Sequence, residues 1–297
     1  MKFRWEELEL RTRHSFAIAR AGSVPVRRSV CIRITDEDGV EGWGEAPVTT
    51  PYYGENADTA AAVLPLLTEA VDAATGGDPF ALARAEAAME KVIGGNRATK
   101  TGVSAALHDL VAKRLGVPVW KLWGLDRSAP VSSFTIAIAE LEEMRLRVRE
   151  AAAYPILKVK VGTSRDEEIL RMIRDEAPDR IIRVDANTAW TARQAIAALP
   201  LMEELGIELI EQPVHPDDLD GLRAVTAVSR IPIVADESCR TASDIPGLAG
   251  AVDGVNIKLA KTGGLREALR LADAARAHGM KVMLGCMIES TLGIAAA

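Results

Sequence analysis

The sequence has few aromatic residues and no long apolar run, and its charges are mixed. Aromatic residues make up 4% of the 297 positions, too few for a surface that stacks nucleic-acid bases. The net charge of −6 comes from interspersed acids and bases, so neither a nucleic acid nor a membrane is an expected partner. No stretch approaches the roughly 18 apolar residues of a membrane span. The charged start, Met1–Glu7, does not resemble a signal peptide.

Cysteine is also scarce. The three residues Cys31, Cys239 and Cys286 are odd in number and far apart, which predicts free thiols in a reducing cytoplasm rather than a disulfide framework. Hydrophobic residues make up 48% of the chain, enough for a sizeable core. These features favour a cytoplasmic globular protein.

The first part of the chain predicts β-structure followed by helices. Alternation in residues 29–35 and 40–45, around the turn at 36–39, predicts a hairpin. Ala- and Leu-rich helical patterns run from about residue 56 to 115. Within the last of these helices, His108 is interpreted as a packing residue and Asp109 as a solvated acid. The Trp- and turn-rich stretch 118–127 predicts a junction, which places an α+β domain at residues 1–126.

After Pro130 short apolar strands alternate with helical segments, a pattern typical of a parallel sheet with helices outside. Helices are expected between the strands, for example at Ser164–Glu176 and Thr191–Leu205. The repeat favours a (β/α) barrel domain at residues 127–297. The predicted strands are Val131–Ile138, Ile156–Val161, Ile181–Asp185, Ile207–Glu211, Ile231–Asp236, Gly254–Leu259 and Lys281–Cys286.

Only seven strands are predicted, and the sequence ends in an apolar, helical-looking segment at 293–297. A closed eight-stranded barrel requires its last strand. The expectation is therefore a barrel of the (β/α)7β type whose eighth strand is missing from this chain.

Lys158 and Lys160 alternate with apolar residues on the second predicted barrel strand, so their side chains share one face. Two ammonium groups inside a protein require anionic partners. Such a pairing also lowers a lysine pKa toward the range in which the amine accepts a proton.

Those partners are predicted at the carboxyl ends of the following strands, where barrel active sites lie. The intervals between Asp185, Glu211, Asp236 and Lys258 are 22 to 26 residues, about one βα unit each. Three carboxylates converging in one mouth require a hard divalent cation, and oxygen ligands select Mg²⁺ or Mn²⁺.

A cation held by these carboxylates gives two of the lysines a predicted role in proton transfer. Lys160 and Lys258 are expected on opposite sides of the cation, an arrangement suited to removing a proton from one face of a carbon and returning one to the other. The metal would stabilise the enediolate formed when the α-proton leaves. Lys158 would lower the pKa of Lys160 and add positive charge near the substrate carboxylate.

Five motifs together resemble the enolase superfamily, muconate-lactonizing subgroup. The resemblance covers nearly the whole chain and implies an N-terminal α+β capping domain followed by a barrel. It also implies Asp185, Glu211 and Asp236 as ligands of one Mg²⁺, with Lys160 and Lys258 as the acid/base pair. The motifs are Lys158-Val-Lys160, Asp185-Ala-Asn187, Glu211-Gln-Pro213, Ala235-Asp-Glu-Ser238 and Ile257-Lys-Leu-Ala-Lys-Thr-Gly-Gly264.

Within that subgroup the sequence is most similar to dipeptide epimerases of the L-Ala-D/L-Glu type. The cues are Ser133–Ile136 and Gly285–Ser290. By this resemblance the substrate-binding residues are Thr135, Lys158, Arg20, Cys286 and Ile288, and the supporting residues behind the ligands are Asn187 and Glu237. Cys286 is expected to be a small packing residue rather than a nucleophile. Family epimerases also carry an Asp-x-Asp on the eighth strand that binds the dipeptide ammonium, and this chain ends before it.

The leading hypothesis is thus an isomerase, a Mg²⁺-dependent dipeptide epimerase that is expected to form a homo-oligomer. A muconate cycloisomerase or an o-succinylbenzoate synthase would use the same site for another reaction. A Schiff-base aldolase acting through Lys258 would not need three carboxylates. A truncated, inactive family member would not need the lysine pair.

Overall fold

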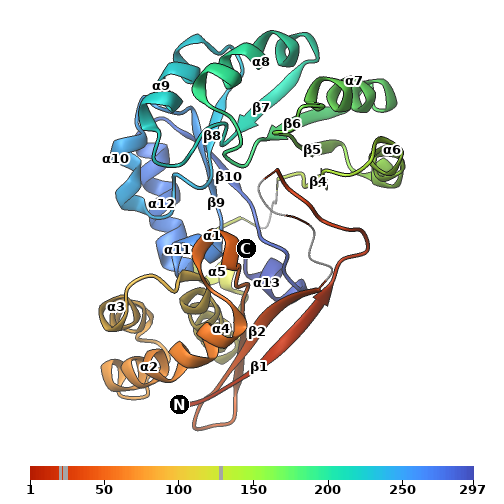
Figure 1. Ribbon diagram of the computed structural model, residues 1–297. Coiled ribbons are helices and arrows are strands. Elements are labelled where there is room, and N and C mark those ends of the chain that lie inside the picture. The colour runs from red at the N-terminus through yellow and green to blue at the C-terminus, as the bar shows by residue number, and fades with distance from the viewer. Residues whose placement is uncertain (20–21, 23–25, 127–129) are drawn as a thin grey trace.

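The computed structural model describes residues 1–19, 22, 26–126 and 130–297, apart from the side chains of residues 51 and 52. A three-stranded antiparallel sheet with helices forms a capping domain, and seven parallel strands with intervening helices follow it (Figure 1). The predicted fold class is therefore confirmed. Within the described residues no helix is long and apolar enough to cross a membrane.

The capping sheet consists of β1 (Lys2–Arg11), β2 (Val26–Thr35) and β3 (Glu41–Ala46), in that order. The predicted hairpin joins β2 to β3. The Asp36 carboxylate accepts hydrogen bonds from the backbone N–H groups of Asp38 and Val40, and Gly39 has a φ of 82°. The turn thus places its left-handed residue at a glycine.

The helices of the capping domain pack against this sheet and toward the barrel (Figure 1). A β-carbon at Gly42 or Gly44 would lie 2.0 or 2.1 Å from a backbone oxygen of α4. Glycine at these two positions therefore allows β3 to approach the helix backbone closely. The helices are α1 (Thr50–Tyr53), α2 (Ala57–Thr75), α3 (Leu82–Val92), α4 (Arg97–Leu115) and α5 (Val119–Leu122).

His108 on α4 is fully buried, as the packing interpretation predicts. Its Nδ1 donates to the Ser104 carbonyl at 2.7 Å, and its ring packs edge-on against Trp123. Burial lowers the pKa of His108 to about 4, even though the hydrogen bond to Ser104 favours the charged form. Asp109 is more than a solvated acid, because its carboxylate accepts hydrogen bonds from the Trp43 N–H and the Lys113 ammonium.

This histidine should make the protein sensitive to acid. The unfolded chain binds the proton near pH 6.5, whereas the folded chain binds it only near pH 4. Protonation of His108 should therefore cost about 2 kcal/mol of stability between pH 7 and pH 5. Urea unfolding at both pH values should show a smaller acid loss in His108→Gln. Equal losses in the two proteins would contradict this assignment.

The parallel strands appear where the sequence predicts them; those at Ile181–Asp185 and Ile207–Glu211 have the predicted bounds, and the other five are shorter. They are β4 (Ser133–Ile136), β5 (Ile156–Lys160), β6 (Ile181–Asp185), β7 (Ile207–Glu211), β8 (Ile233–Ala235), β9 (Gly254–Ile257) and β10 (Lys281–Leu284). Their helices are α6 (Leu141–Glu150), α7 (Asp166–Glu176), α8 (Ala192–Glu204), α9 (Leu219–Val228), α10 (Ile245–Leu248), α11 (Leu259–Thr262), α12 (Leu265–Ala277) and α13 (Thr291–Ala296), with 3₁₀ turns at Ala151–Ala153 and Ala242–Asp244.

The strands follow chain order across the sheet, from β4 at one edge to β10 at the other. In the part of the chain that the structure describes, these two edges do not pair with each other, so the barrel is an open half-barrel. Because every pairing in this sheet is parallel, all carboxyl ends face the same side.

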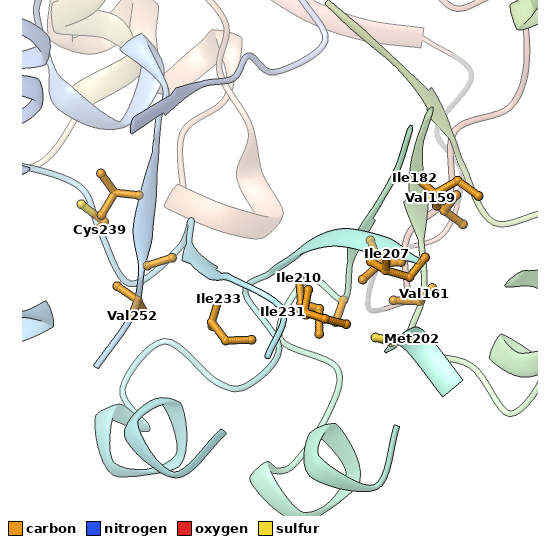
Figure 2. Packing of buried hydrophobic residues seen from close by; sticks show 14 of the residues in the cluster. Val159, Val161, Ile182, Met202, Ile207, Ile210, Ile231, Ile233, Cys239 and Val252 are labelled. Carbon is orange, nitrogen blue, oxygen red and sulfur yellow. The ribbon is translucent and has the colours of Figure 1, made fainter. Parts of the chain in front are cut away.

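The barrel core lies between the sheet and its outer helices. Aliphatic side chains from successive strands, among them Val159, Ile182, Ile210 and Ile233, form one buried layer (Figure 2). Helix α8 adds Met202 to this layer. A capping box at Thr191 begins this helix where the sequence predicts its start. A rigid layer of this kind fixes the strand ends that carry the polar residues.

Glu45 joins the capping domain to the far end of the barrel chain. This side chain on β3 is 2% exposed. Its carboxylate accepts hydrogen bonds from the Ser29 hydroxyl and from the backbone N–H groups of Ser290 and Gly293. The loop that carries Ile288 is thereby tied to the capping sheet.

Candidate active site

The polar residues predicted at the strand ends lie together at the carboxyl side of the sheet. Lys160, Asp185 and Glu211 are the last residues of β5, β6 and β7, whereas Asp236 and Lys258 directly follow β8 and β9. The three carboxylates are 0–1% exposed, and the two lysines are 7% and 8% exposed. The sheet thus brings five charged groups into one buried cluster.

The lysines of β5 meet the anionic partners that the sequence predicts. Lys158 Nζ lies 2.8 Å from Asp185 Oδ2 and 2.6 Å from Glu211 Oε2. Lys160 Nζ donates to Asp185 Oδ2 at 2.7 Å and to Asn187 Oδ1 at 2.8 Å. Asn187 therefore supports Lys160 directly.

Asp236 is held by two further lysines. Lys258 Nζ donates to its Oδ2 at 2.5 Å, and Lys261 Nζ donates to its Oδ1 at 2.6 Å. Lys261 was not predicted as a site residue, although it lies in the motif Ile257–Gly264. Asn256 was also missed, and its side-chain amide donates to Glu211 Oε1 at 2.9 Å.

The two predicted proton-transfer lysines differ in their electrostatic surroundings. Burial lowers the pKa of Lys160, and the nearby Lys158 ammonium adds to this effect against the opposing Asp185 charge. Burial disfavours the charged form of Lys258 as well, but Asp236 and Glu211 outweigh it and raise the Lys258 pKa. The pKa values of the two lysines are thus shifted in opposite directions, downward at Lys160 and upward at Lys258.

For Lys158 the prediction of a lowered pKa is wrong. Burial again opposes its charge, but Asp185 and Glu211 together outweigh burial and raise the pKa. The difference from Lys160 is the number of carboxylates in contact. Lys158 pairs with two, whereas Lys160 pairs with one.

The pKa values of the buried carboxyl groups shift in different directions. The charges of Lys158 and Lys160 overcome the desolvation of Asp185 and lower its pKa, and Lys258 and Lys261 do the same for Asp236. Burial and the Asp185 charge raise the pKa of Glu211. Burial, with help from Asp236, raises the pKa of Glu237 to about 7.

The backbone adopts unusual conformations next to the carboxylates. Asn187 and Gln212 have φ values of 43° and 37°, in the left-handed region that non-glycine residues rarely enter. The Asn187 N–H donates to Asp185 Oδ1 at 2.9 Å, and Gln212 Oε1 accepts from the Asp236 N–H at 2.9 Å. These two strained backbone conformations therefore accompany hydrogen bonds that orient Asp185 and Asp236.

The donor set fits a hard divalent cation. The predicted ligands are carboxylates from three neighbouring strands, and oxygen donors of this kind favour Mg²⁺ or Mn²⁺. The Lys158 ammonium, positioned between Asp185 and Glu211, shows that a cation is accommodated there. Among the described residues, however, no three acids already surround one point. Closing the ligand shell would therefore require small side-chain shifts.

The other predicted substrate contacts lie at the rim. Thr135 on β4 is in register with Lys158 on β5, so both side chains share a face. Ile288 is half-buried in the loop after β10. Cys286 is exposed, so the packing interpretation is wrong. It follows β10, which is an edge strand of the described sheet and pairs with a neighbour on one side only. Arg20 lies outside the described residues.

The capping domain also contributes to the cluster. Burial raises the pKa of Tyr53, at the end of α1, and its interaction with the Asp236 charge adds to the shift. The Arg240 guanidinium lies 5.7 Å from the centre of the Tyr53 ring. Glu237 accepts a long hydrogen bond from the Asn187 amide at 3.4 Å, so the two predicted supporting residues contact each other.

An α+β cap over seven parallel strands, with buried acids and lysines at the strand ends, defines the enolase class of fold. Two family models match the chain. The "Enolase C-terminal domain-like" family matches residues 140–297, and "Mandelate racemase / muconate lactonizing enzyme, N-terminal domain" matches residues 7–124. The chain belongs to this mandelate racemase/muconate lactonizing enzyme family of the enolase superfamily.

Several of the relatives that it resembles are dipeptide epimerases. The chain is 39% identical over 300 residues to the L-Ala-D/L-Glu epimerase of Bacteroides thetaiotaomicron, covering 100% of this chain and 76% of that one. A substrate-liganded structure of the Bacillus subtilis L-Ala-D/L-Glu epimerase gives a TM-score of 0.94 at 32% identity, covering 100% and 85% of the two chains.

An Enterococcus faecalis dipeptide epimerase, solved with Mg and the dipeptide L-Leu-L-Tyr, gives a TM-score of 0.93 at 33% identity. The match covers 99% of this chain and 85% of that one. These relatives confirm the predicted family, and the Enterococcus faecalis structure contains Mg and a dipeptide.

Proposed function

We propose that this protein is a Mg²⁺-dependent epimerase that inverts the α-carbon of the C-terminal residue of a dipeptide, with L-Ala-L-Glu as the leading substrate. The observation that carries the proposal is the buried cluster itself, in which Lys160 and Lys258 flank Asp185, Glu211 and Asp236. Similarity to epimerases that act on dipeptides supports the substrate class.

Asp185, Glu211 and Asp236 would hold the cation, which would supply Lewis-acid stabilisation for the charge that develops on the substrate carboxylate. Their burial removes competing water and strengthens this interaction. Asn187 and Gln212 would keep Asp185 and Asp236 in position through the hydrogen bonds described above.

The lysines would move the proton. Lys160, whose pKa is lowered by burial, would take the α-proton from one face of the carbon. Lys258, whose raised pKa favours the ammonium, would return a proton to the opposite face. The reverse reaction would exchange their roles, because an epimerase must act on both configurations.

Lys158, Thr135, Cys286 and Ile288 would line the substrate pocket. Lys158 would add positive charge near the substrate carboxylate, and Thr135 lies beside it on the same face of the sheet. Arg20 is proposed as a further contact from the capping domain.

The proposal is tested by incubating the protein with Mg²⁺ and a panel of L-Ala-X dipeptides, and separating the diastereomers by chiral chromatography. We expect L-Ala-L-Glu to be converted toward a mixture with L-Ala-D-Glu. Turnover of a muconate or a cyclohexadiene substrate, without dipeptide epimerisation, would point to a cycloisomerase or a dehydratase instead. A borohydride-trapped adduct on Lys258 would point to Schiff-base chemistry.

A further inference from the structure

Lys261 is fully buried beside the cluster, yet it has no part in the proposed proton transfer. Its ammonium donates to Asp236 Oδ1 at 2.6 Å, to the Asp236 carbonyl at 2.5 Å and to the Asn256 carbonyl at 2.7 Å. An ammonium group has three N–H donors, so each of them has an acceptor. Burying a charge this completely is costly unless it is paired, and here the paired group is a predicted metal ligand.

The two oxygens of Asp236 are held differently. Lys258 contacts Oδ2, whereas Lys261 contacts Oδ1. Lys258 is 8% exposed and Lys261 is 0% exposed, so Lys258 is the one positioned to reach a substrate. If Lys258 turned to a substrate, Oδ2 would lose this lysine contact, whereas the contact of Lys261 with Oδ1 would remain.

The short helix that carries Lys261 is itself held from the capping domain. Arg97 donates to the Thr262 carbonyl at 3.1 Å, and the Thr101 hydroxyl donates to the Leu259 carbonyl. Both donors lie on α4, and both acceptors flank Lys261 on α11. Lys261 is thus fixed between the capping domain and the loop after β8.

We propose that Lys261 is a positioning residue that orients Asp236, so that one defined carboxylate oxygen faces the cation. This inference rests on the proposed Mg²⁺-dependent function, because it concerns the same metal site. It makes Lys261 the link by which α4 of the capping domain sets the geometry of a metal ligand on the barrel.

The direction in which Mg²⁺ affinity changes when Lys261 is replaced distinguishes a positioning role from a purely electrostatic one. Removing a positive charge near a cation site would, by Coulomb attraction alone, strengthen Mg²⁺ binding. Loss of an outer contact that orients a ligand instead weakens metal affinity by roughly 10- to 100-fold. Positioning therefore predicts weaker binding in the variant, against the electrostatic trend.

The test is isothermal titration of Mg²⁺ into the metal-free wild-type protein, Lys261→Met and Lys261→Gln, with circular dichroism to verify folding. Lys281→Met is the matched control, because Lys281 is exposed at the start of β10. We expect a roughly 10- to 100-fold loss of Mg²⁺ affinity in the Lys261 variants and wild-type affinity in the control.

Wild-type or tighter affinity in a folded Lys261 variant would overturn the inference. Loss of the folded state in both variants would also overturn it, since Lys261 would then serve the stability of the barrel. A wild-type protein that binds no Mg²⁺ would instead contradict the proposed function, so the two failures are distinguishable.

Discussion

Lys160→Ala and Lys258→Ala are each expected to reduce epimerisation of dipeptides by about 100- to 10,000-fold, the usual contribution of a positioned general acid or base. The reason is that each lysine serves one face of the carbon, and neither can reach the other face. Lys158 cannot replace Lys160, because its contacts with Asp185 and Glu211 raise its pKa and keep it charged.

Mg²⁺ affinity should change much less than epimerisation in these two variants, because the three carboxylates remain. Epimerisation is measured by chiral separation of the two diastereomers, and affinity by isothermal titration. Lys281→Ala provides a control in which an exposed lysine at the start of β10, away from the carboxyl ends of the strands, is lost. Normal epimerisation by either active-site variant would contradict the two-base mechanism.

Asp236→Asn is expected to weaken Mg²⁺ binding by at least about 100-fold, more than the loss of an outer contact. The substitution removes the charge of a proposed ligand and leaves Lys258 and Lys261 buried without their counter-ion. Two uncompensated ammonium groups would repel the cation in addition. Exchange should fall with the loss of bound metal and recover in part at high Mg²⁺ concentration.

Asp273→Asn is the matched control, because this acid on α12 has a side chain that is 78% exposed. Isothermal titration of both variants measures the effect, and circular dichroism verifies that they fold. Unchanged Mg²⁺ affinity in Asp236→Asn would remove this residue from the proposed ligands.

The barrel and its polar strand ends could be predicted because both follow from repetition. One βα unit separates Asp185, Glu211, Asp236 and Lys258 in turn, and parallel strands bring their carboxyl ends to one side. The alternation in β5 placed Lys158 and Lys160 on one face in the same way. The predicted strand Ile231–Asp236 is shorter in the structure, where β8 ends at Ala235 and Asp236 joins the lysines.

Side-chain contacts that form only when the chain folds could not be predicted from the sequence. Lys261 lies on a short helix after β9, where a lysine in sequence resembles any solvated charge, and only the fold shows its burial against Asp236. Tyr53 comes from the capping domain, more than a hundred residues earlier. The raised pKa of Lys158 depends on contact with two carboxylates rather than one, and spacing along the chain does not reveal this.

The most direct test of the central claim is proton NMR in D₂O with Mg²⁺ and L-Ala-L-Glu, following the α-proton signal of the C-terminal residue. Removal of that proton by the buried lysine pair predicts progressive loss of the signal, its arrest by EDTA and its return when Mg²⁺ is restored. A stable signal for L-Ala-L-Glu and every other dipeptide in the panel, with Mg²⁺ shown to be bound, would contradict dipeptide α-proton abstraction at this site.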